Sequence, residues 1–363
     1  MQVKRIVSAV VPPLAFSLCL AWALPTWGQL LPSPKPTGSL LANPPPDVPP
    51  VSPSPLPKCS ETVGCPTNVP GDFVATPAGW YHPSCRIQIA NSEKYDASSN
   101  TIVGSGGASR TVPPCLYPSY APNGEARPVA SSSGGTPQAS APPGGYLESV
   151  DNAYQNSPAV SFLYAGLTVP QPPTSNGATI YLFPGLTSPG YFILQPLLAY
   201  SEDGYWYIQA YDDITGSAHQ IYGSQVNVKP GDEIIGELIG SSCSIYSGAC
   251  STWEVYVYDV QSGLSSYCVA TNSTVFGPAR TVYGAALEVY NATDCSYLPA
   301  SGVANFSLVG TEIVATGTWY PVSAMNLVPY YLTGQGPGVC SPVASISTLP
   351  NPNFSSISLN WTP

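Results

Sequence analysis

Short runs of β-prone residues, separated by turn residues, follow one another from Tyr146 almost to the C-terminus. Turn signals such as Pro-Gly-Asp at Pro230 to Asp232 lie between them, and no alternation of strand and helix patterns occurs. Too few helix-favouring Glu, Lys, Arg and Met residues remain to build a helical protein. This pattern predicts an all-β fold, with strands at 159–169, 178–183, 191–200, 205–211, 224–228, 233–239, 253–260, 281–290, 303–309 and 355–361.

Both faces of the run 253–260 carry large side chains. Counting with a period of two gives one Trp/Val face and one Glu/Tyr face, made of Trp253, Val255 and Val257 and of Glu254, Tyr256 and Tyr258. Such strands are typical of a sandwich in which one face packs on the core and a Tyr-rich concave face meets a ligand. The sequence therefore predicts a β-sandwich of two antiparallel sheets.

The charge balance excludes several classes of function. The chain has 10 Lys and Arg against 20 Asp and Glu, a formal charge of −10, which argues against nucleic acid as a partner. Its two histidines, His82 and His219, lie in no HExxH motif, and no GxSxG motif accompanies them, so we expect both to be ordinary loop or surface residues. We therefore expect no metal and no cofactor, and any catalysis would use carboxylates and amides.

The N-terminus has the pattern of a secretory signal peptide, which we assign to residues 1–23. Lys4 and Arg5 precede a mostly apolar run that ends near the small-x-small sequence Ala21-Trp22-Ala23, although cleavage near Gly28 remains an alternative. The prolines at 12 and 13 argue against a membrane anchor, and no later stretch has 18 uninterrupted apolar residues. We therefore expect a secreted, extracellular protein without a membrane partner once the signal is removed.

Two further segments precede the predicted sandwich. Residues 24–58 form a Pro-rich linker or pro-region, with eleven prolines between Leu30 and Lys58. Residues 59–145 form a segment rich in Cys, Gly and Ser, with one hairpin-like stretch from Arg86 to Val103. The sandwich domain is then assigned to residues 146–363.

Nine cysteines remain after the signal, and in an exported chain they are disulfide candidates first. Short spacings favour pairing Cys59 with Cys65 and Cys243 with Cys250. Longer links between Cys85 and Cys115 and between Cys268 and Cys295 would leave Cys340 unpaired. Sequence alone does not fix this connectivity.

Two polar residues interrupt strands that are otherwise apolar. Gln195 lies within the run Phe192 to Leu198, and Glu288 lies within Gly284 to Tyr290, where it projects with Ala286 and Tyr290. Burial of such groups without a partner costs a few kcal/mol. They are either structural hydrogen-bonding groups or parts of a functional site.

At these residues the sequence resembles the glutamic peptidases called eqolisins, peptidase family G1. The resemblance spans about residues 146–363 and rests on the order and spacing of short motifs: Ala178 to Leu186, Ile193 to Leu198, Trp206 in Gly-Tyr-Trp-Tyr-Ile, Val228 to Ile234, Ala286 to Tyr290 and Ser355 to Trp361. It implies a concanavalin-A-like lectin and glucanase sandwich with two seven-stranded sheets. It also implies that Gln195 and Glu288, 93 positions apart, form the catalytic dyad on the concave sheet.

The resemblance further implies a mechanism and a substrate class. Glu288 would be the general base on water and then the general acid for the leaving amine, while Gln195 would position the water and donate to the oxyanion. Trp206 would line the substrate cleft or serve packing, and Tyr146 stands where the family has a Trp-x-Gly-like element of the cleft wall. We thus expect a monomeric acid endopeptidase acting on proteins or peptides. The low charged fraction, 8%, fits an acidic exterior because few ionic contacts are lost as pH falls.

Two other functions remain open. A non-catalytic module would use a Tyr-rich face to bind a glycan or a peptide. Glycoside hydrolysis needs two facing carboxylates; Glu254 is one candidate, but no ExDxE-like run occurs, so this function ranks lowest. Pepsin-type chemistry is disfavoured because neither Asp-Thr-Gly nor Asp-Ser-Gly is present.

Overall fold

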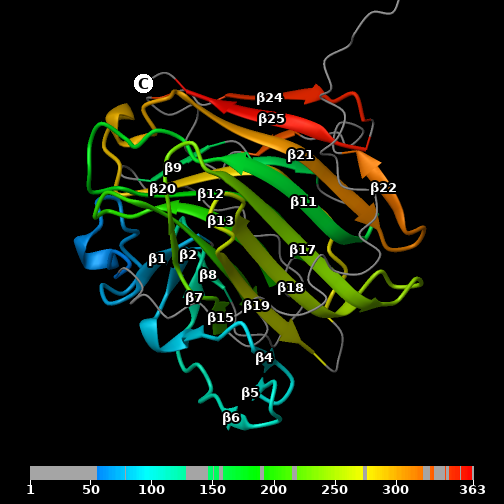
Figure 1. Cartoon of the computed structure of the whole chain (residues 1–363). Coiled ribbons are helices and arrows are strands. Elements are labelled where there is room, and N and C mark those ends of the chain that lie inside the picture. Colours follow the sequence, from blue (N-terminus) through cyan, green and yellow to red (C-terminus); the bar gives the residue numbers. More distant parts are fainter. Residues whose placement is uncertain are drawn as a thin grey trace, which may run out of the picture. The chain divides into compact units, whose positions relative to one another are not determined.

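The predicted all-β sandwich is confirmed (Figure 1). The computed structural model describes residues 55–77, 79–127, 146–149, 151–154, 158–188, 192–214, 219–272, 276–321, 328–330, 340, 343–351 and 353–361. Within these ranges the helical elements are short 3-10 turns: η1 (Cys59–Glu61), η2 (Pro83–Cys85) and η4 (Cys295–Tyr297). The predicted signal peptide and most of the Pro-rich segment lie outside the described residues.

One sheet of the sandwich carries both residues of the predicted dyad. We call it the ten-stranded sheet. Its order is β23 (Val328–Tyr330), β10 (Asp151–Tyr154), β20 (Thr281–Tyr290), β12 (Thr179–Ser188), β13 (Phe192–Tyr200), β14 (Trp206–Ile214), β15 (His219–Tyr222) and β3 (Arg86–Gln88). In addition, β9 (Tyr146–Ser149) pairs with β20, and β16 (Val226–Val228) pairs with β14.

The second sheet, which we call the eleven-stranded sheet, lies against the first. Its order is β24 (Val343–Thr348), β25 (Ser355–Asn360), β21 (Val303–Ile313), β11 (Val160–Thr168), β17 (Glu233–Cys243), β18 (Cys250–Asp259), β19 (Ser265–Thr271), β4 (Glu93–Asp96), β5 (Thr101–Gly104) and β6 (Ser109–Thr111). Strand β22 (Thr318–Pro321) pairs with β21.

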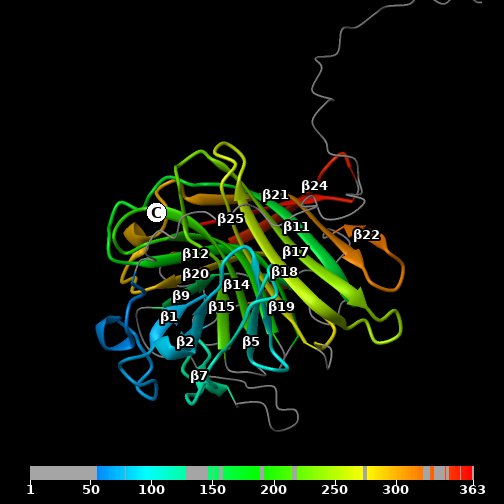
Figure 2. The ribbon, with the colours of Figure 1, turned by 60° about the horizontal axis from the view of Figure 1, so that its bottom comes forward.

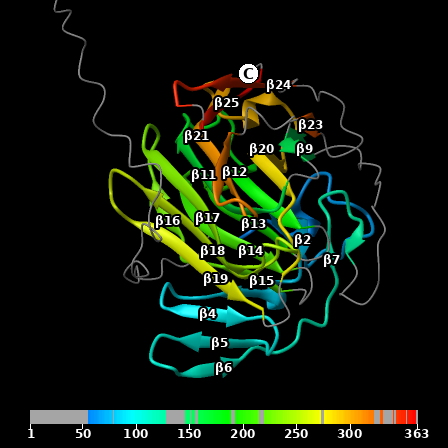
Figure 3. The same ribbon diagram turned by 90° about the vertical axis from the view of Figure 1, so that its right-hand side faces the viewer.

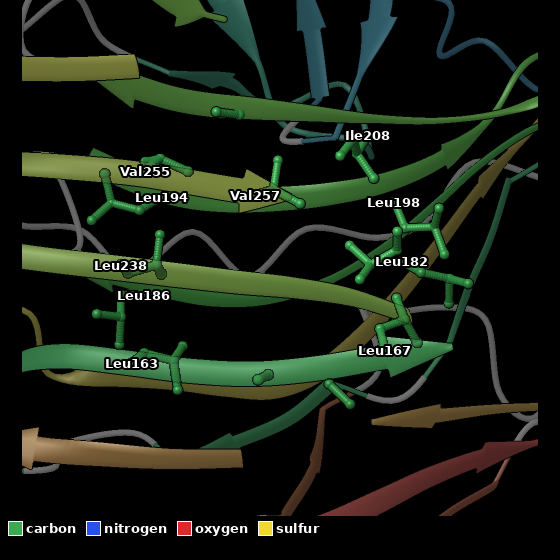
Figure 4. Packing of buried hydrophobic residues seen from close by; sticks show 14 of the residues in the cluster. Leu163, Leu167, Leu182, Leu186, Leu194, Leu198, Ile208, Leu238, Val255 and Val257 are labelled. Carbon is green, nitrogen blue, oxygen red and sulfur yellow. The ribbon is translucent and has the colours of Figure 1, made fainter. Parts of the chain in front are cut away.

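The main core lies between these two sheets (Figure 4). Leu182, Leu194 and Leu198 of the ten-stranded sheet face Leu238 and Val257 of the other, and all are at most 1% exposed. Because side chains alternate along a strand, residues one position away point to the outer face of each sheet. Each fully buried Leu or Val contributes about 1.5–3 kcal/mol relative to an exposed one.

A third, four-stranded sheet, which we call the cap sheet, packs on the outer face of the ten-stranded sheet (Figure 2). Its strands are β1 (Val74–Thr76), β2 (Gly79–Tyr81), β7 (Ser119–Tyr120) and β8 (Ala126–Arg127). The same N-terminal segment adds β3 in parallel to β15, and the β4–β6 meander through β4 in parallel to β19 (Figure 3). The resemblance implied seven strands in each sheet, but the described residues form sheets of ten and eleven strands, partly because residues 86–111 add strands to both.

Four disulfides join the described cysteines, and three of them were predicted: Cys59–Cys65, Cys85–Cys115 and Cys243–Cys250. The fourth prediction is wrong, since Cys295 pairs with Cys340. Cys268 instead remains a free thiol, because β19 points it into the core between the sheets. No helix among the described residues is long and apolar enough to span a membrane.

Candidate active site

Gln195 and Glu288 lie on the same face of the ten-stranded sheet, the outer face beneath the cap sheet. Strand β13 carries Gln195, β20 carries Glu288, and β12 runs between them. Their alternate neighbours Leu197 and Ala286 belong to the apolar cluster formed with the cap sheet. Gln195 is 0% exposed and Glu288 is 5% exposed, so both polar groups are buried as the sequence predicted.

The strand register separates the two side chains. Glu288 is paired with Tyr181 on β12, and Tyr181 is paired with Ala199 on β13, which lies four residues beyond Gln195. Four residues correspond to about 13 Å along a strand, and the two strand spacings add about 10 Å across it. A row that includes Phe183 lies between them. The two Cα atoms are thus about 16 Å apart. Because both side chains stand perpendicular to the sheet, a single water cannot bridge them over this distance.

The β1–β2 hairpin of the cap sheet lies directly on this face. Three consecutive carbonyl groups of the hairpin accept hydrogen bonds from the sheet below. Tyr181 Oη donates to Ala75 O at 3.3 Å, Tyr290 Oη to Thr76 O at 2.9 Å and Gln195 Nε2 to Pro77 O at 3.0 Å. The outer face thus holds an extended peptide backbone through side-chain donors, and two of those donors, Tyr181 and Tyr290, are neighbours of Glu288 in the sheet.

Apolar contacts fix the hairpin in place. Phe73 and Trp80 are 2% and 1% exposed and pack with Phe183 and Tyr290. The Trp80 and Tyr290 rings meet edge to face, with centroids 5.5 Å apart. This geometry favours aromatic pairs by about 0.5–1.5 kcal/mol beyond the burial itself. The hairpin is therefore a packed element of the fold and covers the candidate site.

Burial controls the protonation of the groups on this face. It raises the pKa of Tyr181 well above its usual value, so the hydroxyl stays protonated and remains a hydrogen-bond donor. Burial also raises the pKa of Asp213, partly offset by Arg127, whose Nη1 donates to Asp213 Oδ2 at 2.8 Å. These groups share the outer face and lie under the cap sheet.

The remaining predicted site residues lie elsewhere or are only partly described. Of the two roles left open for Trp206, the structure supports packing: the side chain is 2% exposed in the core between the sheets, on the opposite face from Gln195. Tyr146 pairs in register with Tyr290, but its side chain is outside the described part. Sequence reasoning missed Tyr181 as a site residue. It named Tyr290 only as a neighbour of Glu288, although the shared period-two face was a usable signal.

The described residues contain no group of three or more His, Cys, Asp and Glu side chains able to hold a metal ion. His219 is 1% exposed, with Nδ1 3.0 Å from Tyr95 Oη and Nε2 3.0 Å from Pro113 O. It is thus a buried structural residue and not the expected loop or surface histidine. His82 stacks on Tyr117, with ring centroids 3.5 Å apart.

Comparison with solved structures finds scytalido-glutamic peptidase bound to a peptide-based transition-state analog, at 12% identity and TM-score 0.40, covering 61% of this chain and 99% of that one. SCP-B, a member of the eqolisin family of peptidases bound to the tripeptide Ala-Ile-His, gives 11% identity, TM-score 0.39 and the same coverage. The enzymatically active domain of tailspike protein 2 from bacteriophage CBA120 gives 12% identity and TM-score 0.25, covering 44% of this chain and 23% of that one. No protein-family model matches the sequence, and comparison with curated proteins finds no match.

Proposed function

We propose that this protein is a secreted peptidase, active at acid pH, that binds an extended peptide on the outer face of the ten-stranded sheet. One observation carries the proposal: consecutive carbonyls of Ala75, Thr76 and Pro77 accept hydrogen bonds from side chains of the face that carries Glu288. A bound substrate would take the place of the hairpin and use the same donors. The sequence resemblance to glutamic peptidases points to the same face.

Glu288 is the general base in this proposal. It removes a proton from a water whose oxygen attacks the scissile carbonyl carbon, and the carbonyl electron pair moves to the oxygen. When the tetrahedral intermediate collapses, the C–N bond breaks and Glu288 returns the proton to the leaving amine. The Tyr290 and Tyr181 hydroxyls, which are next to Glu288 in the register, stabilise the developing oxyanion. Gln195, two rows away, holds another carbonyl of the same peptide.

The test is hydrolysis of a denatured protein between about pH 2 and 7, a range that brackets the usual pKa of Glu. We expect Glu288→Gln to lower the rate by about 10²–10⁴-fold, because general acid–base catalysis contributes that much. Glu233→Gln is the matched control, since Glu233 is an exposed carboxylate of the other sheet. Equal activity of wild type and Glu288→Gln would contradict the assignment.

The separation of Gln195 from Glu288 favours one second candidate, peptide binding without hydrolysis. For this function, wild type and Glu288→Gln would be equally inert as enzymes, yet both would bind peptide. Tyr290→Phe would then weaken binding, because it removes the hydroxyl that donates to Thr76 O. Mass spectrometry of the products and calorimetry with the same peptide separate the two candidates.

A further inference from the structure

A row of aromatic side chains with one carboxyl crosses the eleven-stranded sheet. Tyr164 on β11 is paired with Glu237 on β17, Glu237 with Tyr256 on β18, and Tyr256 with Tyr267 on β19. Their neighbours Leu163, Leu238 and Val255 point into the core. The row is therefore on the outer face of this sheet, and the core separates it from Glu288. Strands β11, β17 and β18 of this row lie side by side in Figure 1.

Glu237 is the unusual member of the row. Its side chain is 1% exposed, and Oε1 is buried without a hydrogen-bond partner. The ion pairs between described residues use other carboxylates: Lys58–Glu61, His82–Asp72, Arg110–Glu93 and Arg127–Asp213. A buried acceptor without a donor destabilises the fold, and more so when it is charged. Burial accordingly raises the pKa of Glu237 to about 7.

Three tyrosines surround this carboxyl. Tyr164 and Tyr258 are half-buried, so their rings are reachable from solvent, and the Tyr256 and Tyr258 rings lie 5.2 Å apart. Tyr164 and Tyr256 are the direct register partners of Glu237, and Tyr258 lies on the same face, two residues beyond Tyr256. None of the hydrogen bonds recorded between described side chains joins a tyrosine to Glu237; Tyr267 Oη instead donates to Glu254 at 2.8 Å.

Among the described residues, no ion pair supplies Glu237 with a positively charged hydrogen-bond donor. Aromatic faces are negative in potential and attract cations within about 6 Å, and the carboxylate adds a full charge. A neutral sugar hydroxyl can donate a hydrogen bond but leaves the charge of Glu237 uncompensated. A quaternary ammonium compensates the charge but has no N–H to donate. A protonated primary amine supplies both.

We propose that Glu237, with Tyr164, Tyr256 and Tyr258, forms a binding site for the primary ammonium group of an organic amine. The ammonium N–H donates to Oε1 of Glu237, and its charge lies against the tyrosine rings. The site is independent of the proposed peptidase activity, because it occupies the other sheet.

The first test uses the wild-type protein at pH 8, where Glu237 is ionised. Tyrosine ring resonances are followed by NMR during titration with n-butylammonium, with n-butanol as the neutral probe of the same shape. We expect saturable shifts with the amine and none with the alcohol. Nα-acetyl-lysine amide distinguishes the source: shifts with both amines extend the site to lysine side chains, and shifts with n-butylammonium alone restrict it to small amines.

Substitutions test which residues form the ammonium site. Glu237→Gln keeps the shape and should weaken n-butylammonium binding about tenfold or more, since hydrogen bonds to charged groups contribute about 1.5–3 kcal/mol. Asp203→Asn, an exposed carboxylate between β13 and β14 of the other sheet, should leave the affinity within about twofold. Tyr164→Phe keeps the ring and should bind, whereas Tyr164→Leu should bind more weakly. Equal responses to n-butylammonium and n-butanol, a response to a disaccharide alone, or unchanged affinity in Glu237→Gln would overturn the proposal.

Discussion

Asp212 is buried where a carboxylate is least favoured, in the core between the two sheets. Its register partners Leu194 on β13 and Ile221 on β15 both belong to that core. The side chain is 1% exposed, and neither carboxyl oxygen has a hydrogen-bond partner. Burial, with a smaller contribution from Asp213, raises the pKa of Asp212 well above its usual value. Burial therefore favours the neutral acid form of Asp212 in the folded protein.

This gives a prediction for Asp212→Asn. An acid whose pKa is raised on folding stabilises the native state fully below its unfolded pKa and less as pH rises toward the folded value. We expect the free energy of unfolding of the wild type to be lower at pH 7 than at pH 3. In Asp212→Asn this difference should be smaller by about 1–3 kcal/mol. Urea unfolding at both pH values measures it. Asp203→Asn, at an exposed position, should keep the wild-type slope; the same slope in Asp212→Asn would refute the argument.

At the residue scale, the sequence could single out Gln195 and Glu288 because a polar residue inside an apolar strand is visible in one dimension. It could not assign Trp206 to one face of the strand, because both faces of the run Tyr205 to Tyr211 carry large side chains. The separation between Gln195 and Glu288 was equally invisible, since it depends on the pairing of β12 with both neighbours.

The β1–β2 hairpin is the element that decides access to the candidate site. Its turn depends on Gly79, which has φ +125°, a region that favours glycine. A Cβ atom at this position would also clash with the backbone carbonyl of Tyr120 on β7. Any other residue at this position would therefore strain the hairpin in its closed conformation over Glu288.

We predict that Gly79→Ala loosens the hairpin. Backbone strain of this kind costs about 1–3 kcal/mol. Amide hydrogen exchange of residues 74–81 should then accelerate, and binding of an external peptide to the outer face should increase. Gly106→Ala is the matched control, because a Cβ atom there meets no atom within 4 Å. Unchanged exchange in Gly79→Ala would mean that the hairpin tolerates the strain and that access depends on another element.

At the element scale, strong periodicity was sufficient for the central strands, and the run 281–290 coincides with β20. Strand β19 was not predicted, because Ser265 and Ser266 do not read as apolar; yet Ser266 Oγ accepts a hydrogen bond from Ala210 N of the other sheet. The cap strands were missed because they are two or three residues long and depend on contacts distant in sequence.

For the whole molecule, buried and half-buried acids affect the pH dependence of stability more than acids at the surface do. The pKa values of Asp212, Asp213, Glu202 and Glu237 are raised, mainly by burial. The pKa values of Asp96 and Asp294 are lowered by hydrogen bonds, but both side chains lie near or at the surface. Few ion pairs join the described residues, so little is lost when carboxylates become protonated.

The directions of these pKa shifts predict that the protein is most stable in mild acid, at about pH 4 to 5. Above it, each raised pKa makes the native state less stable as pH rises; for Glu237, the interval from 4.5 to about 7 corresponds to about 3 kcal/mol. The net charge acts in the same direction, because the sequence pI is about 4.4 and repulsion between acidic groups grows above it. Below the maximum, Asp96 and Asp294 lose their hydrogen-bonded charged forms, a smaller effect at the surface.

Thermal unfolding followed from pH 3 to 8 measures the dependence of stability on pH, and Glu237→Gln should flatten the alkaline side of this curve. A maximum near pH 7 with collapse by about pH 4 would contradict both the signs and the acid activity proposed above.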